Sequence, residues 1–198
     1  MLGCLLASLA SGADIWSRDG WLIINEVLVL RPRASSERAV AMAQRLSPIP
    51  DERPVVVVKA ATGVTLNVGE TVIITVDAEE ARLQNSTPEA LAALWATRIN
   101  DARQLPAMKT TLTRLVLPEG GNTRVSFIGS GARRANLAVN PPDAATIRRE
   151  TGSIEVKPKG TGQFTLVATN GSTRLTWTFK TLPYASEFGG PFVAEDRK

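Results

Sequence analysis

The spacing of apolar residues changes along the chain, from long blocks in the first half to short alternating segments in the second. Residues 21–30 form a dense apolar run rich in β-branched side chains, which predicts one mostly buried strand. From Ser36, apolar residues recur at three- and four-residue spacing, which predicts a helix that ends before Pro48. The predicted buried stripe of this helix is Ala39, Met42, Ala43 and Leu46.

Two or three antiparallel strands are expected next, in residues 54–60 and 71–76. Glycines at positions 63 and 69 mark the turns around them. Strict alternation within the second segment would place Val72, Ile74 and Val76 on one face of the sheet.

The strongest local signal is Ser86-Thr87-Pro88-Glu89, in which a serine cap, an early proline and a glutamate indicate the start of a helix. The apolar stripe behind it continues to about Gln104. We expect Trp95 to be a core residue of this helix, because burying an aromatic ring removes a large apolar area from water. The stripe consists of Leu91, Leu94, Trp95, Ile99 and Ala102. Residues 14–106 are therefore predicted to form an α+β domain.

From Leu112 onward, short alternating segments separated by glycine or proline replace the helical stripes. Asn170-Gly171-Ser172 is expected to form a hairpin turn, because Asn-Gly readily adopts positive φ angles. About seven short strands predict an all-β sandwich over residues 111–184. Residues 185–198 are expected to be a flexible tail, in which Phe188 and Phe192 could dock on a partner.

The second half also carries a family resemblance. Its residues are Asn140-Pro141-Pro142-Asp143-Ala144-Ala145-Thr146-Ile147, Gly152-Ser153-Ile154-Glu155-Val156 and Lys159-Gly160-Thr161-Gly162-Gln163-Phe164-Thr165-Leu166. This segment resembles the bacterial immunoglobulin-like (group 2) domains of envelope proteins and the related N-terminal domain of pilus-formation secretins. The resemblance implies an immunoglobulin-like sandwich, but such domains serve as spacers, adhesive modules and assembly pieces alike.

A fainter resemblance covers the first half. It rests on Ser36-Glu37-Arg38-Ala39, Thr75-Val76-Asp77-Ala78, and Leu91-Ala92 followed by Trp95 and Ile99. These segments look like extracytoplasmic domains that precede bacterial mechanosensitive channel cores. The resemblance implies an envelope module and nothing about conduction.

The beginning of the chain resembles a secretory leader. Residues 2–10 are apolar, too few to span a bilayer, and small residues follow at 11–13. We expect 1–13 to be a truncated signal segment and the protein to be periplasmic or extracellular, without a membrane span. Since no positive region precedes the run, a buried structural segment is the alternative. Cys4 also permits a lipoprotein interpretation.

The composition limits the available chemistry. The chain has no histidine, and Cys4 is its only cysteine, so the commonest general base and thiolate reactions are missing from the mature chain. Asp77, Glu79 and Glu80 could bind a hard cation, but we expect Asp77 to cap a short helix instead. Glu26 could be an acid with a raised pKa, but we expect it to point to the open face of the sheet or to pair with an arginine. We predict no cofactor, no metal and no enzymatic activity.

The charge pattern bears on partners. Lys and Arg number 23 against 19 Asp and Glu, a net charge of +4, and the basic residues are dispersed, so no nucleic-acid partner is expected. Arg133, Arg134, Arg148 and Arg149 could converge on one sandwich edge and bind a partner or an anion. Alternatively, they protect that edge from strand pairing. Gly129-Ser130-Gly131 before them is expected to be a hairpin turn.

The leading hypothesis is an exported, non-enzymatic envelope protein that acts as a structural, adhesive or assembly module through protein or surface contacts. One alternative is a ligand-sensing regulatory ectodomain, with Trp16, Trp21 and the arginine pairs lining a groove between the domains. Another is a carboxylate-dependent cell-wall hydrolase, which would need two acids within about 10 Å in a cleft.

Overall fold

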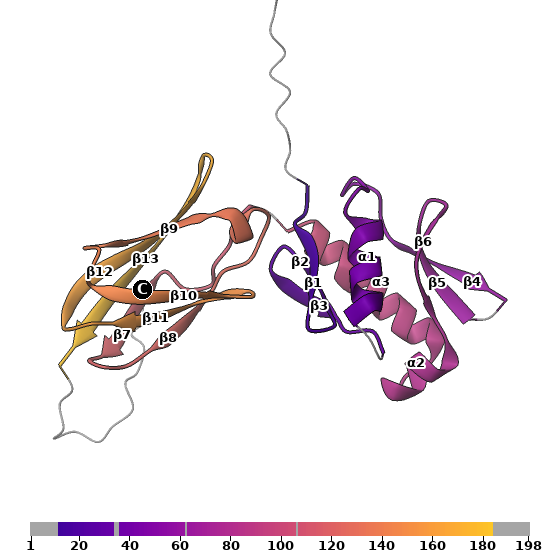
Figure 1. Cartoon of the computed structure of the whole chain (residues 1–198), viewed down its shortest axis with the longest axis horizontal. Helices are drawn as coiled ribbons and strands as arrows, with labels where there is room; N and C mark the ends of the chain where they lie inside the picture. The colour runs from indigo at the N-terminus through magenta and orange to yellow at the C-terminus, as the bar shows by residue number, and fades with distance from the viewer. Residues whose placement is uncertain (1–11, 34–35, 62, 106, 184–198) are drawn as a thin grey trace, which may run out of the picture.

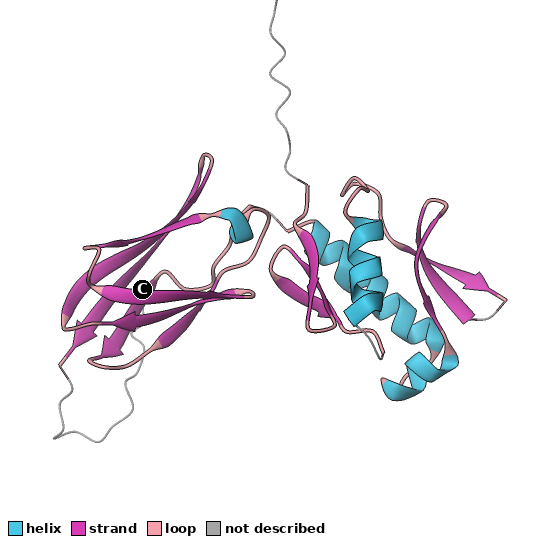
Figure 2. Cartoon of the chain, viewed as in Figure 1, coloured by secondary structure: helices cyan, strands magenta, loops and turns pink. Residues whose placement is uncertain are grey.

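Secondary structure changes character part-way along the chain, as Figure 2 shows. The computed structural model describes residues 12–33, 36–61, 63–105 and 107–183. Helices and strands alternate up to Arg103, and strands with a single 3-10 turn follow from Arg114. The predicted tail, and the predicted signal segment up to residue 11, lie outside the described residues. No described helix is long and apolar enough to cross a membrane.

The N-terminal half places two helices between two small sheets (Figure 1). One sheet has the order β1-β2-β3 and the other β4-β5-β6. Both α1 and α3 contact strands of each sheet, so one continuous core joins the three layers. The predicted mixture of helices and strands is thus present, with two sheets where one was expected. The elements are β1 (Ile15–Arg18), β2 (Trp21–Ile24), β3 (Val27–Leu30), α1 (Ser36–Leu46), β4 (Val56–Ala60), β5 (Gly63–Val68), β6 (Thr71–Val76), α2 (Ala78–Leu83) and α3 (Pro88–Arg103).

Helix α1 has the predicted stripe. Its buried residues are Ala39, Met42, Ala43 and Leu46, spaced so that they share one face of the helix.

Helix α3 begins one residue later than the predicted serine cap. Thr87 is the N-cap, and its side chain accepts a hydrogen bond from the Ala90 N–H at 3.2 Å. Pro88 then occupies the first helical position, where its missing N–H is not needed. Trp95 is buried as expected, but Leu94 is 45% exposed and does not belong to the stripe.

The apolar run 21–30 is not a single strand but the hairpin of β2 and β3. Asn25 and Glu26 form its turn with φ angles of 51° and 66°, the positive values that a two-residue hairpin loop requires. The preceding turn, between β1 and β2, uses Asp19-Gly20 with φ angles of 52° and 79°. An Asp-Gly pair is a hairpin signal, so the sequence contained the evidence for this additional strand.

Strands β4, β5 and β6 pair antiparallel, as predicted. A register shift lies between Leu66 and Asn67 of β5. Opposite it, Ile73 and Ile74 are both buried whereas Val72 is 41% exposed. The predicted face of Val72, Ile74 and Val76 is therefore interrupted by the irregular pairing.

The C-terminal half is a two-sheet β-sandwich with its own core (Figure 1). One sheet has the order β10-β11-β8 and the other β7-β13-β12-β9, with β7 parallel to β13. A three-stranded sheet and a four-stranded sheet with one core between them form the arrangement of an immunoglobulin-like sandwich. The elements are β7 (Arg114–Pro118), β8 (Thr123–Ser126), the 3-10 turn η1 (Ala132–Arg134), β9 (Asn136–Asn140), β10 (Ala145–Glu150), β11 (Ser153–Pro158), β12 (Gly162–Asn170) and β13 (Thr173–Leu182).

The alternating segments supply the sandwich core. Trp177 and Phe179 of β13 are fully buried, and Phe127 contacts the Trp177 ring edge-on at 5.6 Å. Gly171-Ser172 closes the predicted β12–β13 hairpin, since Asn170 pairs with Thr173. The Trp177 indole donates to the Thr110 hydroxyl at 2.9 Å, which satisfies its buried N–H.

Candidate functional site

The four arginines singled out in the sequence do not form one cluster. Arg133 and Arg134 lie in η1, and Arg148 and Arg149 are neighbours on β10. Successive side chains of a strand point to opposite faces, so Arg148 and Arg149 diverge. The predicted convergence of all four is wrong, because the register of β10 separates its two arginines.

Arg148 lies on the outer face of its sheet. Its guanidinium contacts Glu155 at 2.9 Å and Glu150 at 2.6 Å, and its side chain is 65% exposed. Exposed ion pairs of this kind contribute little stability. They balance charge along the surface of the β10-β11-β8 sheet.

Arg134 joins the sandwich to the N-terminal half. Its guanidinium forms an ion pair with Asp14 at 2.8 Å. The second oxygen of the same carboxylate accepts the Gly131 N–H at 3.1 Å. Asp14, the residue that precedes β1, therefore connects η1 to the N-terminal half.

Arg133 makes the neighbouring contact across the same boundary. Its guanidinium lies 4.2 Å from the centre of the Trp16 ring on β1, a cation–π geometry. The Trp16 indole N–H is buried at this contact.

Arg149 fixes the backbone that carries these two arginines. Its guanidinium donates to the carbonyl oxygens of Arg133, in the middle of η1, and of Ala135, which follows η1. Burial lowers the pKa of Arg149 below its ordinary value, an effect that the charge of Glu26 partly offsets. The arginine thus holds η1 in the position from which Arg133 and Arg134 reach the other half.

Glu26 lies beneath the sandwich at this boundary, with 5% of its surface exposed. Its carboxylate oxygen Oε2 accepts the Gly152 N–H at 3.3 Å, and its other oxygen, Oε1, is buried. Burial raises the pKa of Glu26 above the ordinary 4.5; the Gly152 N–H and the charge of Arg133 act in the opposite direction. Burial agrees with the acid of raised pKa, and the charges of Arg133 and Arg149 act on the same carboxylate, as the arginine-partner interpretation expected.

Asn25 is the most completely bonded residue of the boundary. Its side chain accepts the Asp14 N–H at 2.8 Å and donates to the Ala102 carbonyl at 2.8 Å. Its own N–H donates to the Asp14 carbonyl, and its carbonyl accepts the Gly129 N–H at 2.9 Å. One buried turn residue thereby connects β1, the end of α3 and a loop of the sandwich.

We call this set the junction: Asp14, Trp16, Asn25, Glu26, Gly129, Gly131, Arg133, Arg134, Arg149 and Gly152. The segment Gly129-Ser130-Gly131 is not the expected hairpin turn, because η1 follows it and leads to β9. The junction arginines contact groups of the chain itself, so their binding of an external anion or partner stays a prediction. An asparagine inside the apolar run 21–30 was the sequence signal for a turn here.

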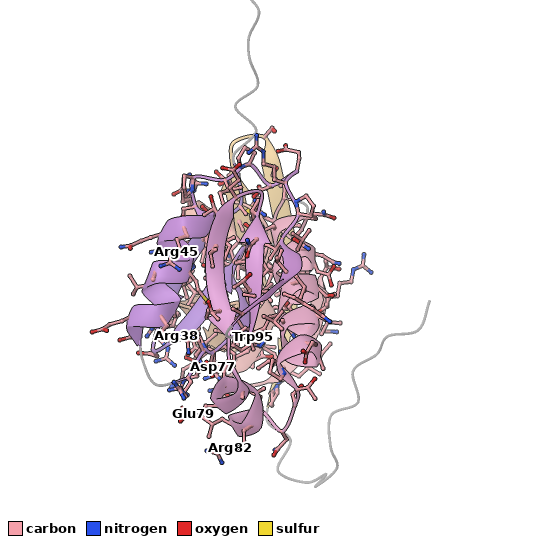
Figure 3. The ribbon with its side chains drawn as sticks, turned by 90° about the vertical axis from the view of Figure 1, so that its right-hand side faces the viewer. Arg38, Arg45, Asp77, Glu79, Arg82 and Trp95 are labelled. Atoms are coloured by element: carbon pink, nitrogen blue, oxygen red, sulfur yellow. The ribbon has the colours of Figure 1, made fainter. Side chains whose placement is uncertain are left out.

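A second polar cluster lies where α1, α2 and β6 meet. Glu80 is fully buried; its carboxylate accepts the Arg33 N–H at 2.8 Å and the Arg38 guanidinium at 2.5 Å. Arg38 also donates to the Thr75 carbonyl at 2.9 Å. Figure 3 shows Arg38, at the beginning of α1, near Asp77 and Glu79.

The acidic residues of this cluster have other partners than a cation. Asp77 caps α2, as expected, and accepts the Glu80 N–H at 2.8 Å; this bond lowers the pKa of Asp77, as does the charge of Arg33. Glu79 pairs with Arg33, and its hydrogen bond raises the pKa of that guanidinium. Among the described residues, no group of three His, Cys, Asp or Glu side chains is placed to hold a metal ion.

Neither buried carboxylate has the setting of a glycosidase acid. Glu26 is enclosed under the Gly152 turn and Glu80 is neutralised by Arg38, whereas a polymer-cleaving pair must face an open cleft. The geometry therefore gives the hydrolase alternative no support.

Comparison with known proteins identifies one family match. Residues 25–105 match a family model described as a domain of unknown function (DUF8459). This segment begins at the junction asparagine and ends just beyond α3. No curated protein matches the chain.

Among the solved structures with similar parts are domains of an S-layer protein and of titin. Domains 4 and 5 of the S-layer protein SbsC are 13% identical, with a TM-score of 0.34, over 60% of this chain and 63% of that one. SbsC domains 5–6 match at 13% identity and a TM-score of 0.32, over 39% and 44%. Titin domain M7 matches at 10% identity and a TM-score of 0.32, over 41% and 97%.

The chain thus covers less than two thirds of either S-layer fragment. Scores at this level carry no argument, and the immunoglobulin-like arrangement rests on the strand order of the sandwich itself.

Proposed function

We propose that this protein is a non-enzymatic module of the bacterial envelope, which acts by binding a protein partner along the edge strand β4. The observation that carries the proposal is the exposure of this strand. β4 is one of the two edge strands of its sheet, and Val56, Val57 and Val58 are 44%, 40% and 40% exposed. An apolar edge strand offers free backbone groups and side-chain contacts to an added strand.

The charged side chains at the junction and around Glu80 are bonded to other groups of the chain, which supports a role in contacts and not in catalysis. The junction groups of Asp14, Arg134 and Arg149 are bonded within the chain, and Glu80 is bonded to Arg38. These bonds fix the two halves and the helices in place. Such a module is suited to present the β4 surface to a partner in a defined position relative to the rest of the protein.

The junction suggests that the two halves act as one unit. The backbone N–H groups of Gly129 and Gly152 of the sandwich donate hydrogen bonds to Asn25 and Glu26, respectively. A partner bound at β4 would therefore be held at a set distance from whatever contacts the sandwich.

Export is the second part of the proposal, and it rests on the apolar residues 2–10 and the small residues that follow. The test expresses the gene with its own upstream region and fractionates the cells. We expect periplasmic or outer-membrane protein processed near Ala13 or lipidated at Cys4. Unprocessed protein in the cytoplasm would overturn export.

The contact itself is tested in cells with a photo-crosslinking amino acid. Benzoylphenylalanine replaces Val57 on β4 or, as a control, Val40, which is 39% exposed on α1. We expect a discrete protein adduct from position 57 and none from position 40. Equal labelling at both positions, or no adduct at position 57, would reject β4 as the contact.

A further inference from the structure

We infer that the pocket enclosed by the β1–β2 turn, residues 31–33, α2 and α3 binds a small organic anion with an apolar body. Its volume is about 880 Å³, within the range of pockets that hold small molecules. It lies in the N-terminal half, and not in the groove between halves where the sequence suggested a ligand. The inference is independent of the proposed contact at β4.

Two guanidinium groups at this pocket have no ionic partner within the described part of the chain. Arg31 and Arg98 line the pocket, and both are exposed. The Arg31 side chain lies over the β1–β2 turn, where its Nε would be 3.4 Å from a Cβ built on Gly20. Guanidinium groups bind carboxylates and phosphates through paired hydrogen bonds.

The other charges at the pocket are already balanced. Asp19 pairs with Arg18 at 3.4 Å. Glu80 is bonded to Arg38, and Arg33 pairs with Glu79. The charge left to attract a ligand is therefore positive and comes from Arg31 and Arg98.

The remaining lining is apolar and aromatic. Leu30 and Trp95, 1% and 2% exposed, line its inner part. Trp21 is half-buried, and Leu83 is 52% exposed. A ligand with a ring beside its anionic group would cover Trp21 and Leu83 while its charge meets the guanidiniums.

Three probes separate the two parts of this recognition: phenyl phosphate, inorganic phosphate and phenol. The full chain is titrated with each while amide and indole NMR signals are recorded. We expect phenyl phosphate to bind saturably and to shift the signals of Gly20, the Trp21 indole and Gln84. Inorganic phosphate, which lacks the ring, and phenol, which lacks the phosphate, should each bind about tenfold more weakly than phenyl phosphate.

Matched variants locate the charge contribution. Arg31→Gln and Arg98→Gln should each weaken phenyl phosphate about tenfold, the usual effect of losing a hydrogen bond to a charged group. Arg174→Gln, at an exposed arginine of β13, should leave it unchanged. Unfolding curves confirm that each variant is folded.

Four results would overturn the inference. Phenyl phosphate could show no saturable binding, or Arg174→Gln could weaken it as much as the two pocket variants do. Inorganic phosphate or phenol could bind as tightly as phenyl phosphate. Finally, the NMR shifts could centre on Leu28 and Ile128, which line a separate pocket of about 310 Å³. None of these results depends on a crosslink at β4, so the inference and the proposed function fail separately.

Discussion

The backbone N–H of Gly152 donates to the Glu26 carboxylate at 3.3 Å, between residues 126 positions apart in the sequence. The two residues occupy turns of different halves, and each is in a positive-φ conformation. The Glu26 carbonyl oxygen is also so close that a Cβ on Gly152 would lie 2.8 Å from it. The two turns are therefore packed backbone to backbone.

Stability should depend on pH through Glu26. Its pKa is raised in the folded state, so the folded protein binds more protons than the unfolded one between the ordinary 4.5 and the raised value. The free energy of unfolding should therefore decrease as pH increases through that window. Urea denaturation from pH 4 to 8 measures it.

The variant Glu26→Gln is the control, because its neutral amide cannot titrate. It should lack this loss of stability above pH 4.5. Asp77→Asn, compared with the wild type in a series extended to about pH 2, tests the opposite sign, since the pKa of Asp77 is lowered. The contribution of Asp77 is present above its ordinary 3.8 and lost as pH falls through the lower value. Parallel pH profiles for wild type and Glu26→Gln would contradict the assignment.

Replacing Gly152 should disturb the junction specifically. Gly152→Ala introduces a Cβ that meets the Glu26 backbone, in addition to the strain of a φ of 72°. Gly120 has a φ of 73° and open space around its Cβ position, so Gly120→Ala measures the strain alone, about 1 kcal/mol. We expect Gly152→Ala to lower the free energy of unfolding by more, and equal losses would show that the turns can separate freely.

Asn25 should be among the most sensitive polar positions. Asn25→Ala removes both side-chain hydrogen bonds and leaves the Asp14 N–H and Ala102 carbonyl without them. The expected loss is about 3 kcal/mol, because unsatisfied buried polar groups are costly. Denaturant unfolding compares it with Asn136→Ala, at an exposed position of β9, which should change stability by less than about 0.5 kcal/mol. Similar values for the two variants would count against the junction.

Glu79 and Glu80 are adjacent but should respond differently to the same change. Glu80→Gln leaves the Arg38 guanidinium without its buried partner, which should cost about 3 kcal/mol. Glu79→Gln removes an ion pair whose acid is 61% exposed, and its effect should stay below about 1 kcal/mol. Thermal and urea unfolding of both variants test this. A larger loss of stability in Glu79→Gln than in Glu80→Gln would show that Glu79 carries the stabilising charge.

Local sequence determined the regular elements. The stripe of Ala39, Met42, Ala43 and Leu46 predicted α1, because residues three and four apart share one helical face whatever that face contacts. The alternation around Trp177 and Phe179 indicated strands of the sandwich, because every second residue of a strand points to the same face of its sheet, whatever covers that face. Thr87 and Asp77 cap their helices through bonds to amides three residues away, which lie within reach of sequence patterns.

Tertiary structure decided the residues whose state depends on distant neighbours. The run 21–30 became a hairpin because Asn25 finds bonding partners at Asp14, Ala102 and Gly129. The spacing of Leu94 fits the apolar stripe of α3, yet Leu94 is exposed. Which side of α3 is buried depends on where the two sheets pack against it. Arg148 and Arg149 differ only in strand parity, and their partners, Glu155 for one and the η1 carbonyls for the other, are brought close by folding alone.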